Sequence, residues 1–257
     1  MAIQKYEADL HIHTLLSPCG EIEMIPSLII ESAVRAGLDI IGIADHNSCE
    51  NAGAVIKASI GSSVKVLPGL EVQSMEGIHL LCLFDTIEQA SKMQEAVHGA
   101  LPAPSLFREG LGRGSGTDSF QEQLIVDSSD EFIGYCERHL SLPTSMSIDE
   151  VWERVENLNG ILIPSHIDRR STGLCDVLGM LPEEPDFPAV EISRNITPLE
   201  ARTTYPSIGD RSIVCSSDAH WLSAIGERRI TFYIEHRTVA EIRMACRGES
   251  GRRVGHA

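Results

Sequence analysis

The sequence predicts an α/β protein of the (β/α)-barrel type, built as a single domain. Short apolar runs that end in polar residues alternate with helical patterns, which is typical of βαβ units around a parallel sheet. The chain has 257 residues, and a (β/α) barrel uses about 250 residues as one domain. Hydrophobic residues make up 42% and charged residues 23% of the chain, as in an ordinary globular protein.

The expected strands are short apolar runs, most of them followed by polar or ionisable side chains. In chain order they cover residues 8–13, 38–44, 64–72, 77–84, 161–165, 189–193, 212–216 and 229–234. The carboxyl ends of the strands of a (β/α) barrel converge on one face, where active sites lie. We therefore expect the polar residues at these strand ends to meet in space.

Start and stop signals support the expected helices. Pro26 fits the first position of a helix, and Gly37 fits its C-terminal stop. Ser147 and Thr238 are each followed three residues later by a glutamate, which is a capping-box pattern. The helical patterns cover residues 26–36, 50–60, 87–97, 148–158 and a terminal segment that begins after residue 238.

One segment interrupts this alternation. Residues 99–116 are rich in Gly, Pro and Ser, and residues 123–135 resemble a hairpin around Asp127 to Asp130. We interpret residues 99–135 as an insertion or flap within one domain that covers residues 1–257.

Bulk properties restrict the partners and the compartment. The formal net charge of −16 argues against a broad, non-specific grip on nucleic acid. The 7 cysteines are scattered without a C-x-x-C pair, which fits a reducing cytoplasm rather than a disulfide framework or a zinc ribbon. Neither a signal peptide nor an apolar run of the roughly 20 residues that span a membrane is present, so we expect a cytoplasmic protein without a membrane partner. No pattern indicates an oligomeric state.

Ionisable residues gather at the ends of the expected strands. His11 and His13 are two apart on a strand, so both point to the same side. A mixture of imidazole and carboxylate favours zinc, iron or manganese, whereas oxygen ligands alone favour magnesium or calcium. A single histidine at a strand end is more often a hydrogen-bonded polar residue than a ligand. The size of this set favours a metal site, and its members are His11, His13, Asp45, His46, Glu71, His79, His166, Asp218 and His220.

Five short strings resemble the motifs of a known family, the PHP (polymerase and histidinol phosphatase) family. In order they are Asp9-Leu10-His11-Ile12-His13-Thr14, Ala44-Asp45-His46-Asn47, Gly69-Leu70-Glu71, Ser165-His166 and Ser217-Asp218-Ala219-His220. The resemblance covers residues 9–220. It implies a distorted (β/α)7, TIM-like barrel with a site for two or three zinc, manganese or iron ions at the C-terminal ends of the strands.

The resemblance also implies which residues hold each of the first two ions, with Glu71 bridging them. His98 and His139 are alternatives to His79, but they lie on expected helical or irregular segments. The first ion would be held by His11, His13, Glu71 and Asp218, and the second by Glu71, His79 and His166.

The third implied site departs from the family pattern. It would use His46 and His220, and family members often add a histidine six residues after the second His of the H-x-H pair. Cys19 stands at that place in this sequence. A thiolate is a good zinc ligand, so Cys19 is a candidate ligand; the alternative is a loop thiol beside a weak or absent third site.

Five residues are expected to act in catalysis or in substrate binding. Paired cations lower the pKa of a bridging water and stabilise charge in an in-line displacement. Asp45, Glu71 and His220 are expected to take part, and Asp45 would either orient His46 or protonate the leaving oxygen. Arg169 and Arg194 would bind phosphate, since the guanidinium fork matches phosphate oxygens; the alternative for each is a surface salt bridge.

The leading functional hypothesis is a phosphatase that acts on a small phosphomonoester of the nucleotide or histidinol-phosphate type, as the family resemblance implies. A phosphodiesterase or exonuclease on short oligonucleotides is the second reading, and nucleic acid beyond that size is not expected. A non-catalytic metal-binding regulatory module is the third. An amidohydrolase-like barrel would also open with H-x-H and close with an Asp, but Asp218-Ala219-His220 favours the phosphoesterase.

Overall fold

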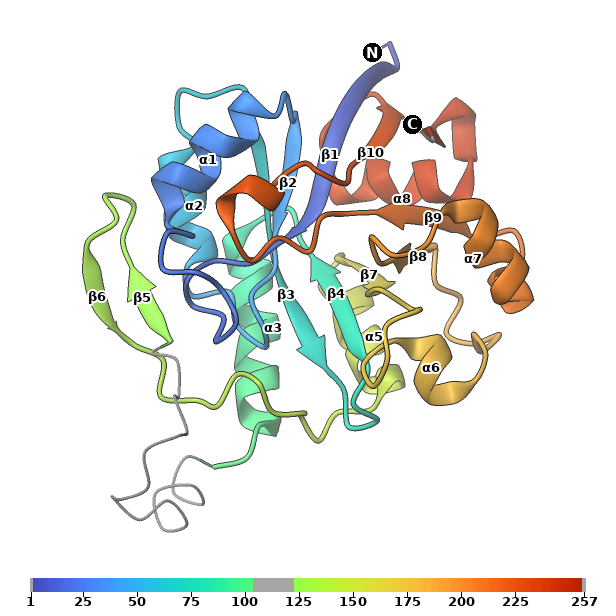
Figure 1. Cartoon of the computed structure of the whole chain (residues 1–257), viewed down its shortest axis with the longest axis horizontal. Coiled ribbons are helices and arrows are strands. Elements are labelled where there is room, and N and C mark those ends of the chain that lie inside the picture. The colour runs from blue at the N-terminus through green and yellow to red at the C-terminus, as the bar shows by residue number, and fades with distance from the viewer. Residues whose placement is uncertain (1, 104–122, 256–257) are drawn as a thin grey trace.

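The computed structural model describes residues 2–103 and 123–255 (Figure 1). Within them, seven strands form a curled sheet in the order β11-β10-β1-β2-β3-β4-β7, and β5-β6 and β8-β9 form two further pairs. The strands are β1 (Gln4–Ile12), β2 (Ile40–Ile43), β3 (Lys65–Gln73), β4 (His79–Leu83), β5 (Leu124–Val126), β6 (Phe132–Tyr135), β7 (Ile161–Pro164), β8 (Ala189–Ile192), β9 (Ser212–Cys215), β10 (Ile230–Ile234) and β11 (Arg253–Gly255).

The sheet is mixed rather than wholly parallel. Strands β1, β2 and β3 are parallel, as expected, but β4 is antiparallel to both β3 and β7. The expectation of parallel strands was therefore wrong at β4, and also at β10, which is antiparallel to β1. The link between β3 and β4, residues 74–78, is too short for the crossover that a parallel pair needs, and it turns tightly at Gly77, where φ is +83°. Because β4 runs backwards, its first residue, His79, lies at the same edge as the last residues of β1, β2 and β3.

At this edge an isolated bridge joins the end of β1 to the segment that follows β9. The parallel pair β8-β9 is hydrogen-bonded to no strand of the seven-stranded sheet within the described residues. Ile12, at the end of β1, forms an isolated parallel bridge with Ala219, and the backbone N–H of His13 donates to the Ala219 carbonyl at 2.9 Å. The result is a curled sheet that fits a distorted barrel, although no continuous ladder of seven regular β/α units runs around it in the described part of the chain.

Apolar layers cover both faces of the sheet. One core cluster packs α1, α2, α3 and α5 against the strands, and the other packs α8 against the opposite face. Figure 1 shows α1 and α2 on one side of β1 to β4 and α8 on the other. The helices are α1 (Pro26–Arg35), α2 (Ala52–Ala58), α3 (Ile87–Ala100), α5 (Ile148–Asn157), α6 (Leu174–Leu178), α7 (Pro198–Thr204) and α8 (Val239–Arg247).

The expected helix signals are present. Pro26 opens α1, and Gly37 follows its end with φ of +70°. Ser147 forms a complete capping box with Glu150, and Thr238 accepts the expected N-terminal hydrogen bond of α8. The hairpin expected at residues 123–135 is formed by β5 and β6, whereas residues 104–122 of the expected insertion lie outside the described residues. Among the described helices, none has the length and apolar character needed to cross a membrane.

Candidate metal centre

The buried carboxylate of Glu71 forms the middle of the site. Glu71 lies on β3 and is 1% exposed. Its Oε1 atom is 3.0 Å from His79 Nδ1 and 3.0 Å from His166 Nε2, and its Oε2 atom is 2.9 Å from His46 Nδ1. One carboxylate therefore contacts imidazoles from three different strand ends, which is the arrangement that a bridging metal ligand requires.

His11, His13 and Asp218 converge beside it. The Nε2 atoms of His11 and His13 are 3.1 Å apart, so both rings point inward, as their spacing predicted. Asp218 Oδ1 is 3.2 Å from His13 Nε2 and 3.7 Å from His11 Nε2. These ligand atoms all lie within 4.8 Å of one another, close enough to bind one ion. We call His11, His13, Glu71, His79, His166 and Asp218 the inner cluster.

Hydrogen bonds on the outer sides of two rings determine which nitrogens carry protons. His11 Nδ1 is 2.9 Å from Glu191 Oε2, a carboxylate oxygen that only accepts. His13 Nδ1 is 2.9 Å from Ser17 Oγ, whose own hydrogen is donated to Asp45 Oδ1 at 2.6 Å. Both Nδ1 atoms therefore carry the hydrogen of the neutral ring, which leaves two Nε2 lone pairs facing each other across 3.1 Å. Two facing lone pairs repel each other unless a proton or a cation lies between them.

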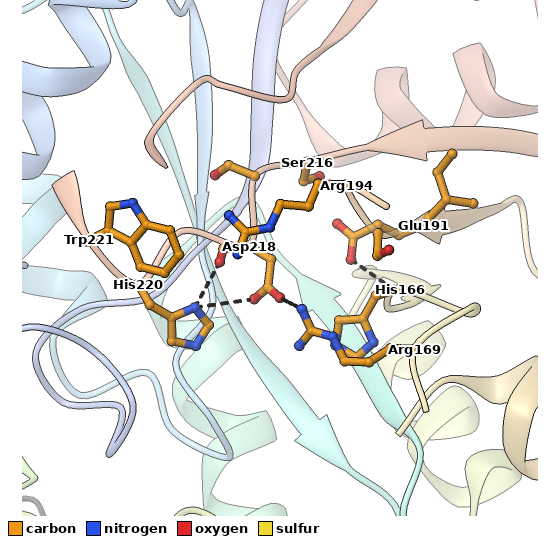
Figure 2. A pocket seen from close by; sticks show the side chains of 11 residues that line it. His166, Arg169, Glu191, Arg194, Ser216, Asp218, His220 and Trp221 are labelled. Atoms are coloured by element: carbon orange, nitrogen blue, oxygen red, sulfur yellow. Dashed lines mark hydrogen bonds and ion pairs between the residues drawn. The ribbon is translucent and has the colours of Figure 1, made fainter. Parts of the chain in front are cut away.

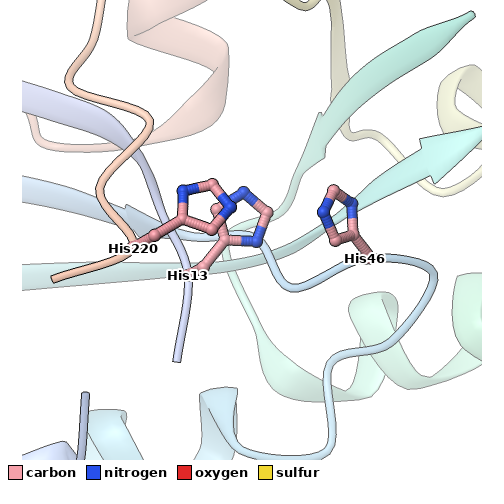
Figure 3. A group of neighbouring side chains, drawn as sticks. All are labelled: His13, His46 and His220. Carbon is pink, nitrogen blue, oxygen red and sulfur yellow. The ribbon is translucent and has the colours of Figure 1, made fainter. Parts of the chain in front are cut away.

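A second group of donors lies nearer the surface. Cys19 Sγ is 3.2 Å from His46 Nε2. Figure 3 shows His46 and His220 on either side of His13, and the ring centroids of His13 and His220 are 4.2 Å apart. His220 Nδ1 donates to the backbone carbonyl of Asp218 at 2.8 Å, so its Nε2 atom keeps a lone pair. We call Cys19, His46 and His220 the outer cluster.

The charges of the two clusters shift their proton affinities. Burial opposes protonation of His11, but the neighbouring carboxylates of Glu191, Glu71 and Asp218 outweigh it and raise the pKa of His11 well above its ordinary value. Burial favours the neutral form of Glu71, but the adjacent imidazoles of His79 and His11 hold the pKa of this carboxyl well below its usual range. Three carboxylates in one buried pocket thus attract positive charge.

The neighbouring imidazoles also shift the pKa of the Cys19 thiol. Burial would raise the pKa of Cys19, but hydrogen bonds and charge from His220 and His46 lower it to about 6. A substantial fraction of Cys19 is therefore thiolate at neutral pH, the form that binds metals.

Several buried polar atoms of the inner cluster have no hydrogen-bond partner. Leaving such an atom unsatisfied costs about 1–3 kcal/mol. A cation bound among the inner-cluster ligands would satisfy the carboxylate oxygens, which face the imidazoles, so the residues present fit a metal centre. Imidazole and carboxylate donors suit zinc, manganese and iron. The unpartnered atoms are Glu71 Oε2, Asp218 Oδ1, His79 Nδ1 and His166 Nδ1.

The backbone is strained where it carries this site. His166, Asp218 and Asn47, which follows His46, have φ values of +27°, +51° and +50°. Residues other than glycine rarely adopt positive φ, and such strain concentrates at functional sites. For Asn47 the side chain compensates, because its amide donates to the carbonyls of Leu140 and Leu142, each at 2.9 Å.

A small cavity of about 70 Å³ opens beside the inner cluster (Figure 2). Both predicted phosphate-binding arginines line it. Arg169 forms an ion pair with Asp218, and the Arg194 guanidinium lies 5.1 Å from the centre of the Trp221 ring. Ser216 and Ser217 also line the cavity, together with the ligand candidates His166 and His220.

The structure brings together the nine predicted metal ligands, which are six histidines, Glu71, Asp218 and Cys19, but it changes the role expected of Asp45. Its carboxylate is fully buried, accepts hydrogen bonds from Thr14 and Ser17, and does not line the cavity. The role of leaving-group proton donor does not fit this position. Sequence reasoning missed Ser17, the link from Asp45 to His13, because a serine in a loop carries no recognisable signal. Among the described residues, the alternatives His98 and His139 belong to no group of converging ligand atoms.

The fold and the donor set define a class, the α/β proteins with a candidate metal centre at one edge of a curled sheet. The sequence profile of the family described as PHP domain matches residues 9–166, more than half of the chain. The chain therefore belongs to the PHP domain family, as the motifs indicated. No curated protein sequence matches it.

Solved structures share the fold at low sequence identity. The lesion-specific endonuclease PfuEndoQ from Pyrococcus furiosus has a TM-score of 0.64 and 18% identity over 98% of this chain, which spans only 58% of that protein. A protein from Bifidobacterium adolescentis, provisionally assigned as a metal-dependent phosphoesterase, has a TM-score of 0.55 and 18% identity over 86% of this chain and 88% of its own. An amidohydrolase from Chromobacterium violaceum, solved with sulfate and without metal, has a TM-score of 0.56 and 15% identity over 86% and 90% of the two chains.

Proposed function

We propose that this chain is a phosphatase that hydrolyses small phosphomonoesters, of the nucleotide or histidinol-phosphate type, with two or three zinc, manganese or iron ions. The observation that carries the proposal is the position of Glu71. Its buried carboxylate lies 2.9–3.0 Å from the imidazoles of His46, His79 and His166. An arginine-lined cavity opens directly beside the same inner cluster.

The inner cluster would hold two ions that share Glu71. Ions bound in this way lower the pKa of a bound water and neutralise charge on the phosphoryl oxygens. The first ion would bind His11, His13, Glu71 and Asp218, and the second would bind Glu71, His79 and His166.

The surrounding residues hold these ligands in position. Glu191 keeps the Nδ1 proton on His11, and the Asp45–Ser17 pair does the same for His13, so both Nε2 atoms face the ions. Such partners on the far side of a ligand are worth about 10- to 100-fold in metal affinity. Asp45 is therefore assigned as a positioning residue of His13.

The two arginines would bind the substrate phosphate. Arg169 already contacts Asp218, and a phosphate oxygen in the cavity would compete for the same guanidinium. Arg194 lies over Trp221, which keeps its charge at the wall of the cavity.

Hydrolysis of a phosphodiester in nucleic acid is the second candidate. The fold similarity to an endonuclease favours it and weakens the expectation that nucleic acid is excluded beyond short oligonucleotides. The net charge of −16 counts against it, because binding to a nucleic-acid backbone relies on Lys and Arg. A non-catalytic module is not favoured, since all the predicted ligands converge.

Phosphate release from a panel of substrates tests the proposal. The chain, loaded in turn with zinc, manganese and iron(II), is assayed with mononucleotides, histidinol phosphate, phosphodiesters, short oligonucleotides and duplex DNA that contains an abasic site. We expect monoesters to be hydrolysed at least about tenfold faster than any diester. Faster cleavage of DNA would establish the second candidate, and no hydrolysis with any metal would refute both.

A further inference from the structure

The loop that carries Cys19 is built to hold it beside His220. Cys19 follows β1 and precedes α1. The Gly20 N–H donates to the Ser17 carbonyl at 2.8 Å, and the Glu21 N–H donates to the His220 carbonyl at 2.8 Å. Backbone hydrogen bonds on both sides of Cys19 thus fix the loop to the turn that carries His220.

Gly20 shows how tightly this loop is packed. A Cβ atom at this position would lie 2.4 Å from the Thr14 carbonyl oxygen, a distance that no side chain tolerates. The loop therefore has little freedom to move Cys19 away from the outer cluster, although the Cys19 residue itself is exposed.

Two imidazole rings, those of His46 and His220, lie beside the Cys19 sulfur. His46 Nδ1 is paired with Glu71 Oε2 at 2.9 Å, and its Nε2 atom, on the other side of the ring, is 3.2 Å from Cys19 Sγ. His220 Nδ1 donates to the backbone carbonyl of Asp218, so its Nε2 atom keeps a lone pair. Cys19 contacts both rings, but one thiol hydrogen satisfies at most one of the two nitrogens.

The imidazoles converge independently of the thiol. Ligand nitrogens of His13, His46 and His220 lie within 4.8 Å of one another. His13 Nε2 is directed to the inner cluster, where it contacts His11 and Asp218. His46, His220 and Cys19 then remain as three donors around one position, on the side of the metal centre that is nearer the surface.

The family resemblance already implies a third cation position beside the pair that Glu71 bridges. We propose that Cys19 Sγ is a ligand at that position together with His46 Nε2 and His220 Nε2, and that the sulfur makes the position selective for zinc over manganese. The proposal rests on the proposed function in assuming that the inner cluster holds its own ions. A soft thiolate selects zinc, whereas manganese prefers oxygen ligands. Three protein ligands leave a fourth position open, which is the pattern of a zinc site that takes part in chemistry.

Cobalt titration of the metal-free, full-length protein tests the sulfur ligand without relying on activity. We expect wild type to develop a sulfur-to-cobalt charge-transfer absorption in the near ultraviolet as its last site fills. Cys19→Ala and Cys19→His should lack this absorption, and Cys136→Ser, which changes a half-buried free thiol outside both clusters, should keep it. Elemental analysis should show one zinc fewer in Cys19→Ala at limiting zinc, because its affinity at this site falls about 100-fold or more. Cys19→His should accept manganese and zinc with a smaller preference than wild type.

Alkylation with iodoacetamide gives a second measurement on the unaltered chain. Saturating zinc should slow alkylation of Cys19 at least about tenfold while leaving Cys136 unchanged. Equal alkylation of Cys19 with and without zinc, or the same cobalt absorption in Cys19→Ala as in wild type, would overturn the proposal. If two ions bind and phosphate esters are hydrolysed without any sulfur absorption, only this proposal fails. If the absorption appears and no ester is hydrolysed, only the proposed function fails, and if no metal binds, both fail.

Discussion

The inner and outer clusters share one pocket but are supported differently. In the inner cluster His11 and His13 are fully buried, and Glu191 and Ser17 hold the far side of each ring. In the outer cluster the side chains of His46 and His220 are 14% and 15% exposed, and Cys19 is exposed. The outer ligands stand on loops, and the inner ones stand mainly on strands or directly at strand ends.

This difference indicates which cluster should bind its metal ions tightly and which should exchange them with solvent. Buried carboxylates without hydrogen-bond partners make the inner cluster costly to leave without cations. The outer cluster meets solvent and is held by loop hydrogen bonds, so an ion there exchanges more readily. We expect inner substitutions to abolish metal binding and outer substitutions to change which metal binds.

The largest effect is expected from Glu71→Ala. Glu71 contacts five histidines of the two clusters, so its loss should remove both inner ions and lower kcat/KM by about 1,000-fold or more. Elemental analysis and phosphate release measure the two effects. Glu153→Gln, an exposed glutamate on α5, serves as the control and should behave as wild type. Full turnover by Glu71→Ala would remove the basis for distinguishing the two clusters.

Glu191→Gln should have the next largest effect. The neutral amide still accepts from His11 but loses the charge that favours the ligand tautomer, so metal affinity should fall about 10- to 100-fold. Competition with a chromogenic chelator measures the affinity. Asp168→Asn is the control, because the carboxylate of Asp168 accepts its hydrogen bonds from Ser193 instead. An unchanged affinity would show that the far-side hydrogen bond to His11 does not support the inner cluster.

Arg194→Ala should act on the substrate rather than on the metal. It removes a charge from the cavity wall, so KM for a phosphomonoester should rise about tenfold while the metal content stays constant. Steady-state kinetics with parallel elemental analysis separate the two quantities. Arg170→Ala, which changes an exposed arginine next to Arg169 in the sequence, should leave KM unchanged. A loss of metal in Arg194→Ala would mean that the cavity and the centre are not independent.

The smallest effect is expected from Ser17→Ala. Removing the hydroxyl breaks the link between Asp45 and His13, which should lower kcat/KM about 2- to 10-fold and destabilise the fold by about 1–3 kcal/mol. Thermal unfolding and kinetics measure these changes. Ser48→Ala is the matched control, since Ser48 is a buried serine that donates to Gln94 instead. If both variants lose the same activity, the hydrogen bond to His13 has no special role.

Much of the site could be predicted because its ligands lie at strand ends. The two-residue spacing of His11 and His13 on β1 fixed their common direction, and Glu71 stands on its expected strand. His79 reached the same edge for a different reason, because the short turn after β3 reverses the chain. Ser17 could not be predicted, since loop hydrogen bonds follow no periodicity. The pairing of His11 with Glu191 spans 180 residues, and only the closed fold brings them together.

The contact between Ile12 and Ala219 joins residues that are far apart in the sequence, so the metal centre can form only late in synthesis. Asp218 and His220 flank the second of these residues, so a nascent chain lacks two ligands until more than 200 residues have left the ribosome. Contacts of such large sequence separation form late, because closing a long loop costs entropy before the contact repays it. A ribosome-bound fragment that ends after β7 would therefore carry most of the histidines without the completed metal centre.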